Sequence, residues 1–268
     1  MSLVDQFNRQ ISYLRISVTD RCNLRCQYCM PEEGVEMLRH EDVLSFEDIV
    51  TFTETAVSMG IRKIRLTGGE PLVRRHIVQL VALLAKIKGV EDFGMTTNGI
   101  LLTKYAKQLK EAGLHRVNIS LDSIDPDVYN KITRCGDIND VFKGIDAAKK
   151  AGFETIKINC VIKKNAQEPD AKAVASFGEE NNLQVRFIRQ MDLEAGQYWV
   201  VDGGTGGDCK ACNRLRLTSN GQLKPCLISD LSYDIRKMGF KKAIEVAVDR
   251  KPKKGVFSTK NKFHSIGG

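Results

Sequence analysis

The chain has 268 residues, 42% of them hydrophobic and 28% charged, which is enough for one large core or for a core with a small added module. It contains no apolar run of about 18 residues and no secretion signal, so we expect a cytoplasmic protein without a membrane partner. The formal net charge of +8 favours an anionic ligand.

Six β-rich segments alternate with helical patterns in the first part of the chain. The expected strands are 11–18, 61–67, 90–97, 114–121, 153–162 and 183–189. Gly60, Gly89, Gly113 and Gly152 each end a helical pattern just before a strand, because glycine tolerates the left-handed conformation that closes a helix. Right-handed crossovers wind such units into a parallel sheet. We predict an α/β fold, a partial (β/α)6 TIM-like barrel over residues 1–190.

The helices expected between these strands are amphipathic. Ser45 is a candidate N-cap for the first of them. The apolar stripes at helical spacing are Ile49, Phe52, Ala56 and Met59, then Ile77, Leu80, Val81, Leu84 and Ile87, and finally Val141, Ile145 and Ala148. The near-continuous apolar strands fit a sheet covered by helices on one face and by side chains on the other.

Three cysteines follow the first strand in the run Cys22-Asn-Leu-Arg-Cys26-Gln-Tyr-Cys29. Three thiolates leave one iron of a [4Fe–4S] cluster open, which a purely structural site would not need. The alternative is a zinc site, but its nearest histidine, His40, lies eleven residues further on. The loop falls at the carboxyl end of the strands, where barrel enzymes collect their reactive groups.

The alternation stops near residue 190, and a glycine-rich stretch, 202–208, follows. No Lys-Ser pair comes after it, so we interpret it as a flexible linker rather than a phosphate-binding loop. We predict that residues 191–268 form a small C-terminal iron–sulfur module.

A second cysteine group, Cys209, Cys212 and Cys226, has the spacing C-x2-C-x13-C. The spacing alone suits zinc with an unseen fourth ligand as well as a second cluster. Arg214 and Arg216 follow directly, and on an extended segment both would point to one side, as a phosphate site requires.

Two cysteines stand outside these groups. Cys160 lies in an apolar strand and is expected to be a small core residue, and Cys135 receives no role. The basic tract 251–254 is expected to be solvated surface.

The order of these motifs resembles the radical S-adenosylmethionine (SAM) superfamily. The run Thr67-Gly-Gly-Glu-Pro71 after the second strand is similar to the GGEP element of that superfamily. The resemblance implies that the amino and carboxylate groups of SAM complete the open iron of the first cluster, while the glycine backbone and the glutamate hold the methionine end and a tyrosine lies against the adenine. The implied SAM contacts are Tyr28, Gly68, Gly69, Glu70, Thr96 and Ser120.

Within the superfamily, the chain resembles the branch that cyclises GTP in molybdenum cofactor biosynthesis. The similarity covers residues 6–192 and 209–268 and depends on the segment 13–22, on the second triad with its Arg-x-Arg and on the terminal glycine pair. It implies a lyase with two [4Fe–4S] clusters, SAM and an electron donor. A radical derived from SAM would remove hydrogen from C3′ of GTP, and attack on C8 would give (8S)-3′,8-cyclo-7,8-dihydroguanosine 5′-triphosphate.

The same resemblance implies a cationic GTP site in which the second cluster ligates the guanine. The implied substrate-binding residues are Arg15, Lys63, Arg65, Lys157, Arg186, Arg214 and Arg216. Of these, Arg15, Arg214 and Arg216 would take part in catalysis together with Gly267 and Gly268. Lys63 and Arg65 share one face of a strand, and charges inside a barrel are costly unless a ligand compensates them.

One departure leaves alternatives open. Between Met191 and Cys209 the chain has seventeen residues, where the family has a much longer segment. A radical SAM enzyme for another nucleotide or for a peptide is therefore an alternative, and a two-cluster electron carrier or a zinc-stabilised nucleic-acid binder is another. An electron carrier has no use for the Gly-Gly-Glu run, and the basic residues lack interleaved aromatics, so we expect no nucleic-acid partner. A homodimer is a further possibility.

Overall fold

A single open sheet forms the centre of the molecule. The computed structural model describes residues 3–266, and its nine strands have the order β6-β5-β4-β3-β2-β1-β7-β8-β9. The strands are β1 (Tyr13–Ser17), β2 (Lys63–Thr67), β3 (Asp92–Thr97), β4 (Arg116–Ser120), β5 (Ile156–Ile162), β6 (Gln184–Arg189), β7 (Arg214–Leu217), β8 (Gln222–Lys224) and β9 (Tyr233–Asp234). The first six pair in parallel, which confirms the predicted partial barrel.

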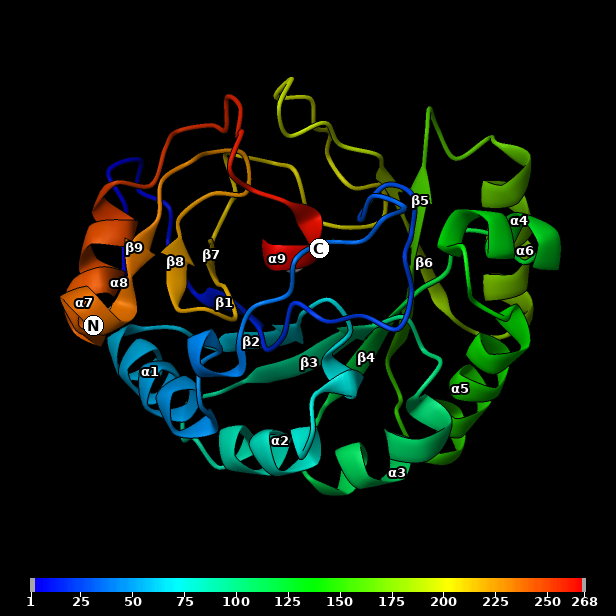
Figure 1. Cartoon of the computed structure of the whole chain (residues 1–268), viewed down its shortest axis with the longest axis horizontal. Helices are drawn as coiled ribbons and strands as arrows, with labels where there is room; N and C mark the ends of the chain where they lie inside the picture. Colours follow the sequence, from blue (N-terminus) through cyan, green and yellow to red (C-terminus); the bar gives the residue numbers. More distant parts are fainter. Residues whose placement is uncertain (1–2, 267–268) are drawn as a thin grey trace.

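Helices cover the convex side of the curved sheet (Figure 1). They are α1 (Phe46–Met59), α2 (Ile77–Ala85), α3 (Leu102–Glu111), α4 (Pro126–Thr133), α5 (Ile138–Lys150), α6 (Pro169–Glu180), α7 (Ile235–Met238), α8 (Phe240–Asp249) and α9 (Phe263–Ile266), with short 3-10 turns at His40–Asp42 and Pro71–Val73. Ser45 caps α1 as predicted, in a capping box with Asp48. Among residues 3–266, no helix is long and apolar enough to cross a membrane.

The predicted helix stripes form the core. Ile49, Phe52 and Leu80 are fully buried, together with the helix-facing strand residues Ile16 and Phe93. The four glycines expected to end helices all have positive φ. The opposite, concave face is polar, so the strands alternate rather than run continuously apolar as the sequence suggested.

The chain beyond residue 190 does not form a separate sheet. β7 pairs in parallel with β1, with Tyr13 opposite Arg214 and Arg15 opposite Arg216. β8 and β9 extend the same sheet in antiparallel fashion. The final helix, α9, lies over the concave opening (Figure 1), where Ile266 packs with Leu193 and Ile228.

Candidate active site

The first cysteine triad is placed by the end of β1 and by α4. Its members, on the loop after β1, are Cys22, Cys26 and Cys29. Arg134, just beyond α4, donates hydrogen bonds to the carbonyls of Arg25 (2.6 Å) and Met30 (2.9 Å), which lie within or beside the cysteine run. This clamp holds the loop at the carboxyl ends of the strands, as predicted from the sequence.

Tyr28 is fixed from the neighbouring strands. Its hydroxyl donates to Asp122 Oδ2 (2.8 Å), and Asp122 Oδ1 accepts the Val161 N–H (2.7 Å). Burial raises the pKa of Asp122 to about 6. The phenol is therefore held beside Cys29, and its stacking on adenine stays a prediction.

The glycine element packs directly against the loop that enters the triad. The Gly69 N–H donates to the Thr19 carbonyl (2.8 Å), and the Glu70 N–H donates to the Arg21 carbonyl (2.8 Å). A Cβ on Gly68 or Gly69 would collide with the carbonyls of Thr19 and Arg21, respectively. Both glycines are thus needed for close approach of the two loops.

We expect Gly69→Ala to displace this loop and with it Cys22. SAM cleavage should fall by on the order of 100-fold, since misplacement by about 1 Å has effects of this size. Iron content and 5′-deoxyadenosine formation measure the loss. Gly152→Ala is the control, because its Cβ meets no atom within 4 Å but its φ is +81°. It should lower stability and leave cleavage by the folded protein unchanged; equal losses of cleavage in both variants would contradict the argument.

Glu70 is buried and bound to protein groups on every side. Its carboxylate accepts hydrogen bonds from the Leu72 N–H (3.0 Å), Thr97 Oγ1 (2.8 Å) and the Asn98 N–H (2.7 Å). Burial nevertheless raises its pKa to about 7. In this structure the carboxylate ties the glycine element to the end of β3, and the SAM contact expected of it stays a prediction.

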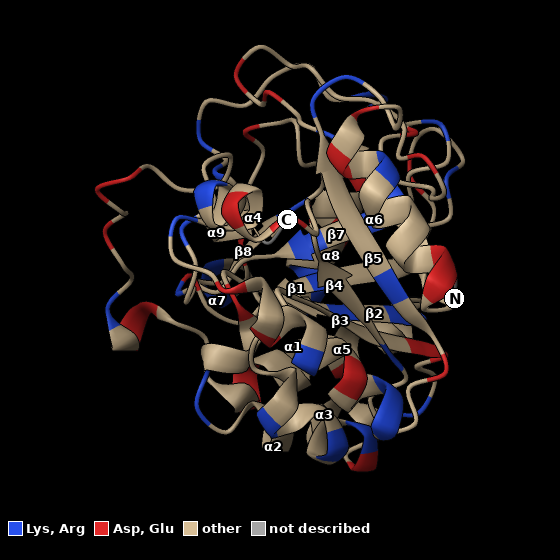
Figure 2. Ribbon diagram, turned by 90° about the vertical axis from the view of Figure 1, so that its right-hand side faces the viewer, with Lys and Arg blue, Asp and Glu red and all other residues tan. Residues whose placement is uncertain are grey.

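The strand register brings nine of the predicted site residues to one face. Paired residues of parallel strands point the same way, and the side chains opposite one another belong to the concave side. These residues are Arg15, Lys63, Arg65, Thr96, Ser120, Lys157, Arg186, Arg214 and Arg216. Lys63 is exposed at the strand start, whereas Arg65 is only 3% exposed. Figure 2 shows basic residues on these central strands.

Crowding of like charges marks this face as a site for an anion. Burial, together with neighbouring guanidinium groups, lowers the pKa values of Arg15, Arg65 and Arg216 to about 10 each. Nε and Nη1 of Arg65 and Oδ1 of Asn118 are buried and have no hydrogen-bond partner among the described residues. Burying charged or polar atoms without hydrogen-bond partners costs free energy of folding. A phosphate-bearing ligand would offset this cost by accepting hydrogen bonds from the arginines.

Tyr13 lies within the arginine cluster and was not predicted. Burial raises its pKa, but the charges of Arg15, Arg65 and the neighbouring arginines lower it overall. The guanidinium of Arg214 lies 5.5 Å from the Tyr13 ring centroid and donates to Thr205 Oγ1 (3.0 Å). The glycine-rich stretch that contains Thr205 therefore packs against the site and is more than a linker.

The main counter-charge on this face is Asp92. It forms a bidentate pair with Arg116, at 2.6 and 2.5 Å. Burial would raise the pKa of Asp92, but the hydrogen bonds and charge of Arg116 lower it overall. The pair joins β3 to β4 on this face of the sheet.

Asp92→Asn should destabilise the fold by about 1–3 kcal/mol at neutral pH by breaking this pair. The folded pKa of Asp92 lies below its ordinary value of 3.8, so its contribution is complete above pH 3.8 and is lost as the pH falls through the folded pKa. The free energy of unfolding, measured with denaturant at several pH values, should differ between Asp92→Asn and wild type. That difference should shrink only in this acid range. The exposed Asp146→Asn is the control, and a difference independent of acid pH would contradict the assignment.

The second cysteine triad lies at the other end of β1 and β7. Its members are Cys209, Cys212 and Cys226. Cys212 precedes Arg214, which pairs with the start of β1, whereas the first triad follows the end of β1. The two triads are thus separated by the length of β1, about 13 Å at 3.3 Å per residue, with the arginines between them.

Protein contacts also fix the second triad. Tyr198 Oη lies 3.2 Å from Cys209 Sγ. Arg9, paired with Asp5 at 2.6 Å, donates to the Cys209 carbonyl at 2.7 Å. Phe263 packs beside Cys226 in the small apolar cluster under α9.

Both donor sets fit iron–sulfur clusters by their chemistry. Burial raises the pKa of Cys22 to about 11 and that of Cys29 to about 12, and the thiols are close enough for their charges to interact. Such thiols ionise when they coordinate a metal. Within residues 3–266, no three or more His, Cys, Asp or Glu side chains are placed to hold a single metal ion. A [4Fe–4S] cluster differs because it takes one thiolate per iron, so its ligands are spread over a larger span.

Several residues at the site were missed by sequence reasoning. Arg116 and Asn118 alternate along β4 as Lys63 and Arg65 do along β2, so strand alternation could have revealed them. Cys160 is buried as expected, and Cys135 is exposed. Gly267 and Gly268 lie outside the described residues.

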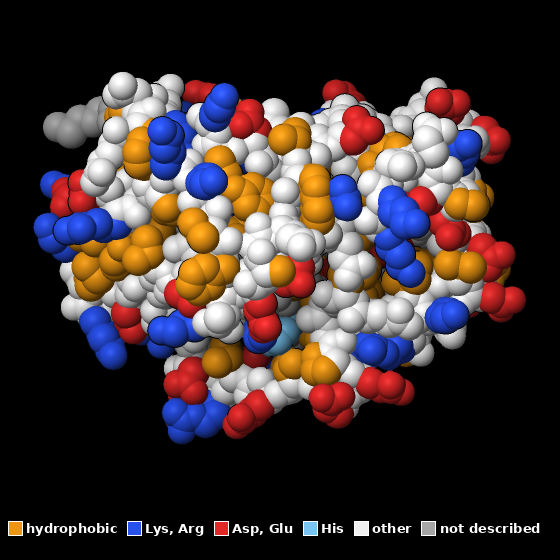
Figure 3. All heavy atoms as spheres, turned by 90° about the horizontal axis from the view of Figure 1, so that it is seen from above, with side chains coloured by type: hydrophobic (Ala, Val, Ile, Leu, Met, Phe, Trp, Pro, Cys, Tyr) orange, Lys and Arg blue, Asp and Glu red, His pale blue; other side chains and the backbone are white. Residues whose placement is uncertain are grey.

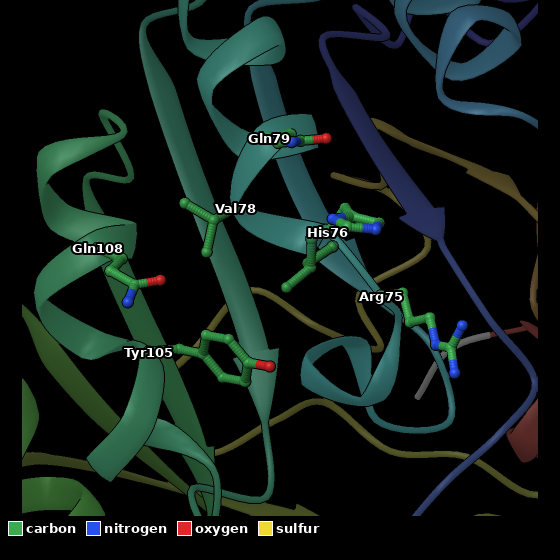
Figure 4. A pocket seen from close by; sticks show the side chains of 7 residues that line it. Arg75, His76, Val78, Gln79, Tyr105 and Gln108 are labelled. Atoms are coloured by element: carbon green, nitrogen blue, oxygen red, sulfur yellow. The ribbon is translucent and has the colours of Figure 1, made fainter.

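The outer face seen from above carries side chains of mixed character. On the face in Figure 3, basic, acidic and apolar side chains are interspersed. A hollow between α2 and α3, lined by Arg75, His76, Gln79, Tyr105 and Gln108 (Figure 4), lies on the convex, helical side.

The Radical SAM superfamily model matches residues 16–189. The match includes the first triad, the glycine element and strands β1 to β6, apart from the start of β1. The chain therefore belongs to the radical SAM superfamily, and SAM and iron–sulfur clusters are its cofactors.

Its curated relatives narrow the family further. Proteins named GTP 3′,8-cyclase from Thermodesulfovibrio yellowstonii and Geobacter sulfurreducens are 43% and 41% identical, over 87% and 88% of this chain and 87% and 86% of their own length. The GTP 3′,8-cyclase of Petrotoga mobilis is 38% identical over 323 residues, covering 99% of this chain and 100% of its own. With them the chain belongs to the GTP 3′,8-cyclase family. The last alignment is longer than the chain, so this relative has residues without counterparts here.

Solved structures agree on the fold. Streptococcus suis SuiB bound to precursor peptide SuiA has a TM-score of 0.68 at 17% identity, covering 96% of this chain and 70% of its own. Native anSMEcpe with bound AdoMet has a TM-score of 0.64 at 17% identity, covering 89% and 82%. At these identities, the likeness supports the architecture alone.

Proposed function

We propose that this enzyme cyclises GTP to (8S)-3′,8-cyclo-7,8-dihydroguanosine 5′-triphosphate in molybdenum cofactor biosynthesis. The main support is the row of buried and half-buried arginines between the two cysteine triads, which lie at opposite ends of β1. A triphosphate needs several converging cations, and a nucleotide is long enough to reach from one triad towards the other.

The first triad would hold the cluster that binds SAM, and the second triad the auxiliary cluster near the base. When bound and reduced, the first cluster with SAM supplies the hydrogen-abstracting radical. The chain's own residues bind and orient the substrate. Arg15, Arg65 and Arg216 would hold the phosphates. The Asn118 amide oxygen would accept a hydrogen bond from a donor on the nucleotide. The helix α9 and residues 190–208 would limit access of water.

The electron donor, the oligomeric state and the location of the protein are separate questions. The first cluster needs an external electron donor, and the donor's identity, a homodimer and a cytoplasmic location stay predictions. The domain boundary at residue 190 also stays a proposal. β7 lies beyond it but belongs to the same sheet as β1.

The test is anaerobic incubation of reconstituted enzyme with SAM, dithionite and a panel of GTP, ATP, GDP and peptides. Mass spectrometry should show 5′-deoxyadenosine in all reactions and a cyclised isomer only with GTP. Deuterium at C3′ of GTP should appear in 5′-deoxyadenosine. If GTP is recovered unchanged while 5′-deoxyadenosine accumulates, the substrate is a different one.

A further inference from the structure

Lys251 is a buried lysine that donates two backbone hydrogen bonds beside the second triad. The residue is only 3% exposed to solvent. Nζ donates to the Arg214 carbonyl (2.8 Å) and to the Pro225 carbonyl. Arg214 follows Cys212 by two residues and Pro225 directly precedes Cys226, so both bonds hold Nζ beside these two ligand cysteines. An ammonium group has three donors, so one is left besides the two that these carbonyls accept.

The charge of Lys251 has no carboxylate partner. Among residues 3–266, no Asp or Glu forms an ion pair with it, and the nearby Arg9 is already paired with Asp5. The anionic groups that interact with Lys251 are the thiolates of Cys212 and Cys226. A buried ammonium is costly without a negative partner, so the ligand thiolates of the second triad are its counter-charge.

The first triad has different surroundings. Glu70, an acid, interacts with Cys22, and Asp122, another acid, interacts with Cys26. The cation beside the first triad, Arg134, is only half-buried and bonds to the carbonyls of Arg25 and Met30. The chain thus places an acid near two thiols of the first triad and a buried cation against the second.

We propose that Lys251 is a positioning residue for the auxiliary cluster that raises its reduction potential and links it to the substrate arginines. Net charge and hydrogen bonds to the sulfurs set the potential of an iron–sulfur cluster. A fixed positive charge at Cys212 favours the more negative, reduced state. Through the Arg214 carbonyl, the same ammonium also fixes the start of β7. The inference rests on the proposed function only for the presence of the second cluster.

The experiment uses the full chain with Cys22, Cys26 and Cys29 replaced by serine, so that only the auxiliary cluster is loaded. Its midpoint potential is measured by EPR-monitored redox titration. Lys251→Met should shift the reduction equilibrium at least tenfold towards the oxidised form, which is 59 mV for one electron. Lys251→Arg keeps the positive charge, so its midpoint potential should stay close to that of the wild-type residue. Lys253→Met, an exposed site in the same tract, should have no effect.

An unchanged potential in Lys251→Met at full iron loading would overturn the proposal. If that variant does not fold, the wild-type sequence gives the answer: lysine labelled with 15N at Nζ should produce a hyperfine coupling in pulsed EPR of the reduced auxiliary cluster. Absence of that coupling would overturn the proposal too. Neither readout depends on SAM cleavage or on GTP, so failure here is distinct from failure of the cyclase assignment.

Discussion

Cys22→Ala is expected to abolish SAM cleavage, whereas Cys226→Ala should retain cleavage and lose the cyclised product. The first triad lies beside the glycine element, and with one thiol removed it cannot hold a cluster that leaves a single iron open for SAM. The second triad lies at the opposite end of β1, beyond the arginines, so its loss should affect the fate of GTP rather than the formation of 5′-deoxyadenosine.

The measurement is iron content, 5′-deoxyadenosine and cyclised nucleotide for each variant under anaerobic conditions. Wild type should hold about eight irons, four per cluster, and each variant about half of that. Cys135→Ala is the control, because this cysteine is exposed and belongs to neither triad. Equal loss of cleavage in Cys22→Ala and Cys226→Ala, both soluble, would reject the division of roles.

Arg65→Met should weaken GTP binding and stabilise the free enzyme. Arg65 is buried, and two of its nitrogens have no partner among the described residues. Each lost charge-assisted contact to phosphate costs about 1.5–3 kcal/mol of binding, or roughly 10- to 150-fold in affinity. Removing a buried charge that lacks full compensation should raise the free energy of unfolding by about 1–4 kcal/mol.

Isothermal titration calorimetry with GTP and denaturant unfolding without it would measure the two effects. Lys107→Met is the control, since Lys107 is exposed on α3, on the helix-covered side of the sheet. It should change both quantities little. Weaker binding together with lower stability in Arg65→Met would indicate a structural role for Arg65 instead.

Local patterns were enough to predict the barrel and the first triad. Gly60 and Gly113 end helices because of backbone conformation, which is a property of one residue. Cys22, Cys26 and Cys29 lie within one short run soon after β1, so their spacing alone placed the triad on the loop that follows this strand.

Long-range pairing and burial were harder to predict. The partnership of β7 with β1 joins residues at opposite ends of the chain, and the four-residue strand Arg214–Leu217 carries too short a pattern to show it. Lys251 was assigned to solvent because the tract 251–254 is basic, but only its neighbours Lys253 and Lys254 are exposed. What surrounds Lys251 is set by Arg9, Arg214 and Pro225, which are distant in sequence.

The parallel pairing of β7 with β1 has a consequence for synthesis on the ribosome. β1 is synthesised well before β7, and one of its edges keeps unpaired N–H and C=O groups until Arg214–Leu217 have been translated. Such an open edge is a template for pairing with other nascent chains. β7 therefore acts as an intramolecular cover for the edge of β1, and premature termination before Arg214 would leave that edge exposed to aggregation.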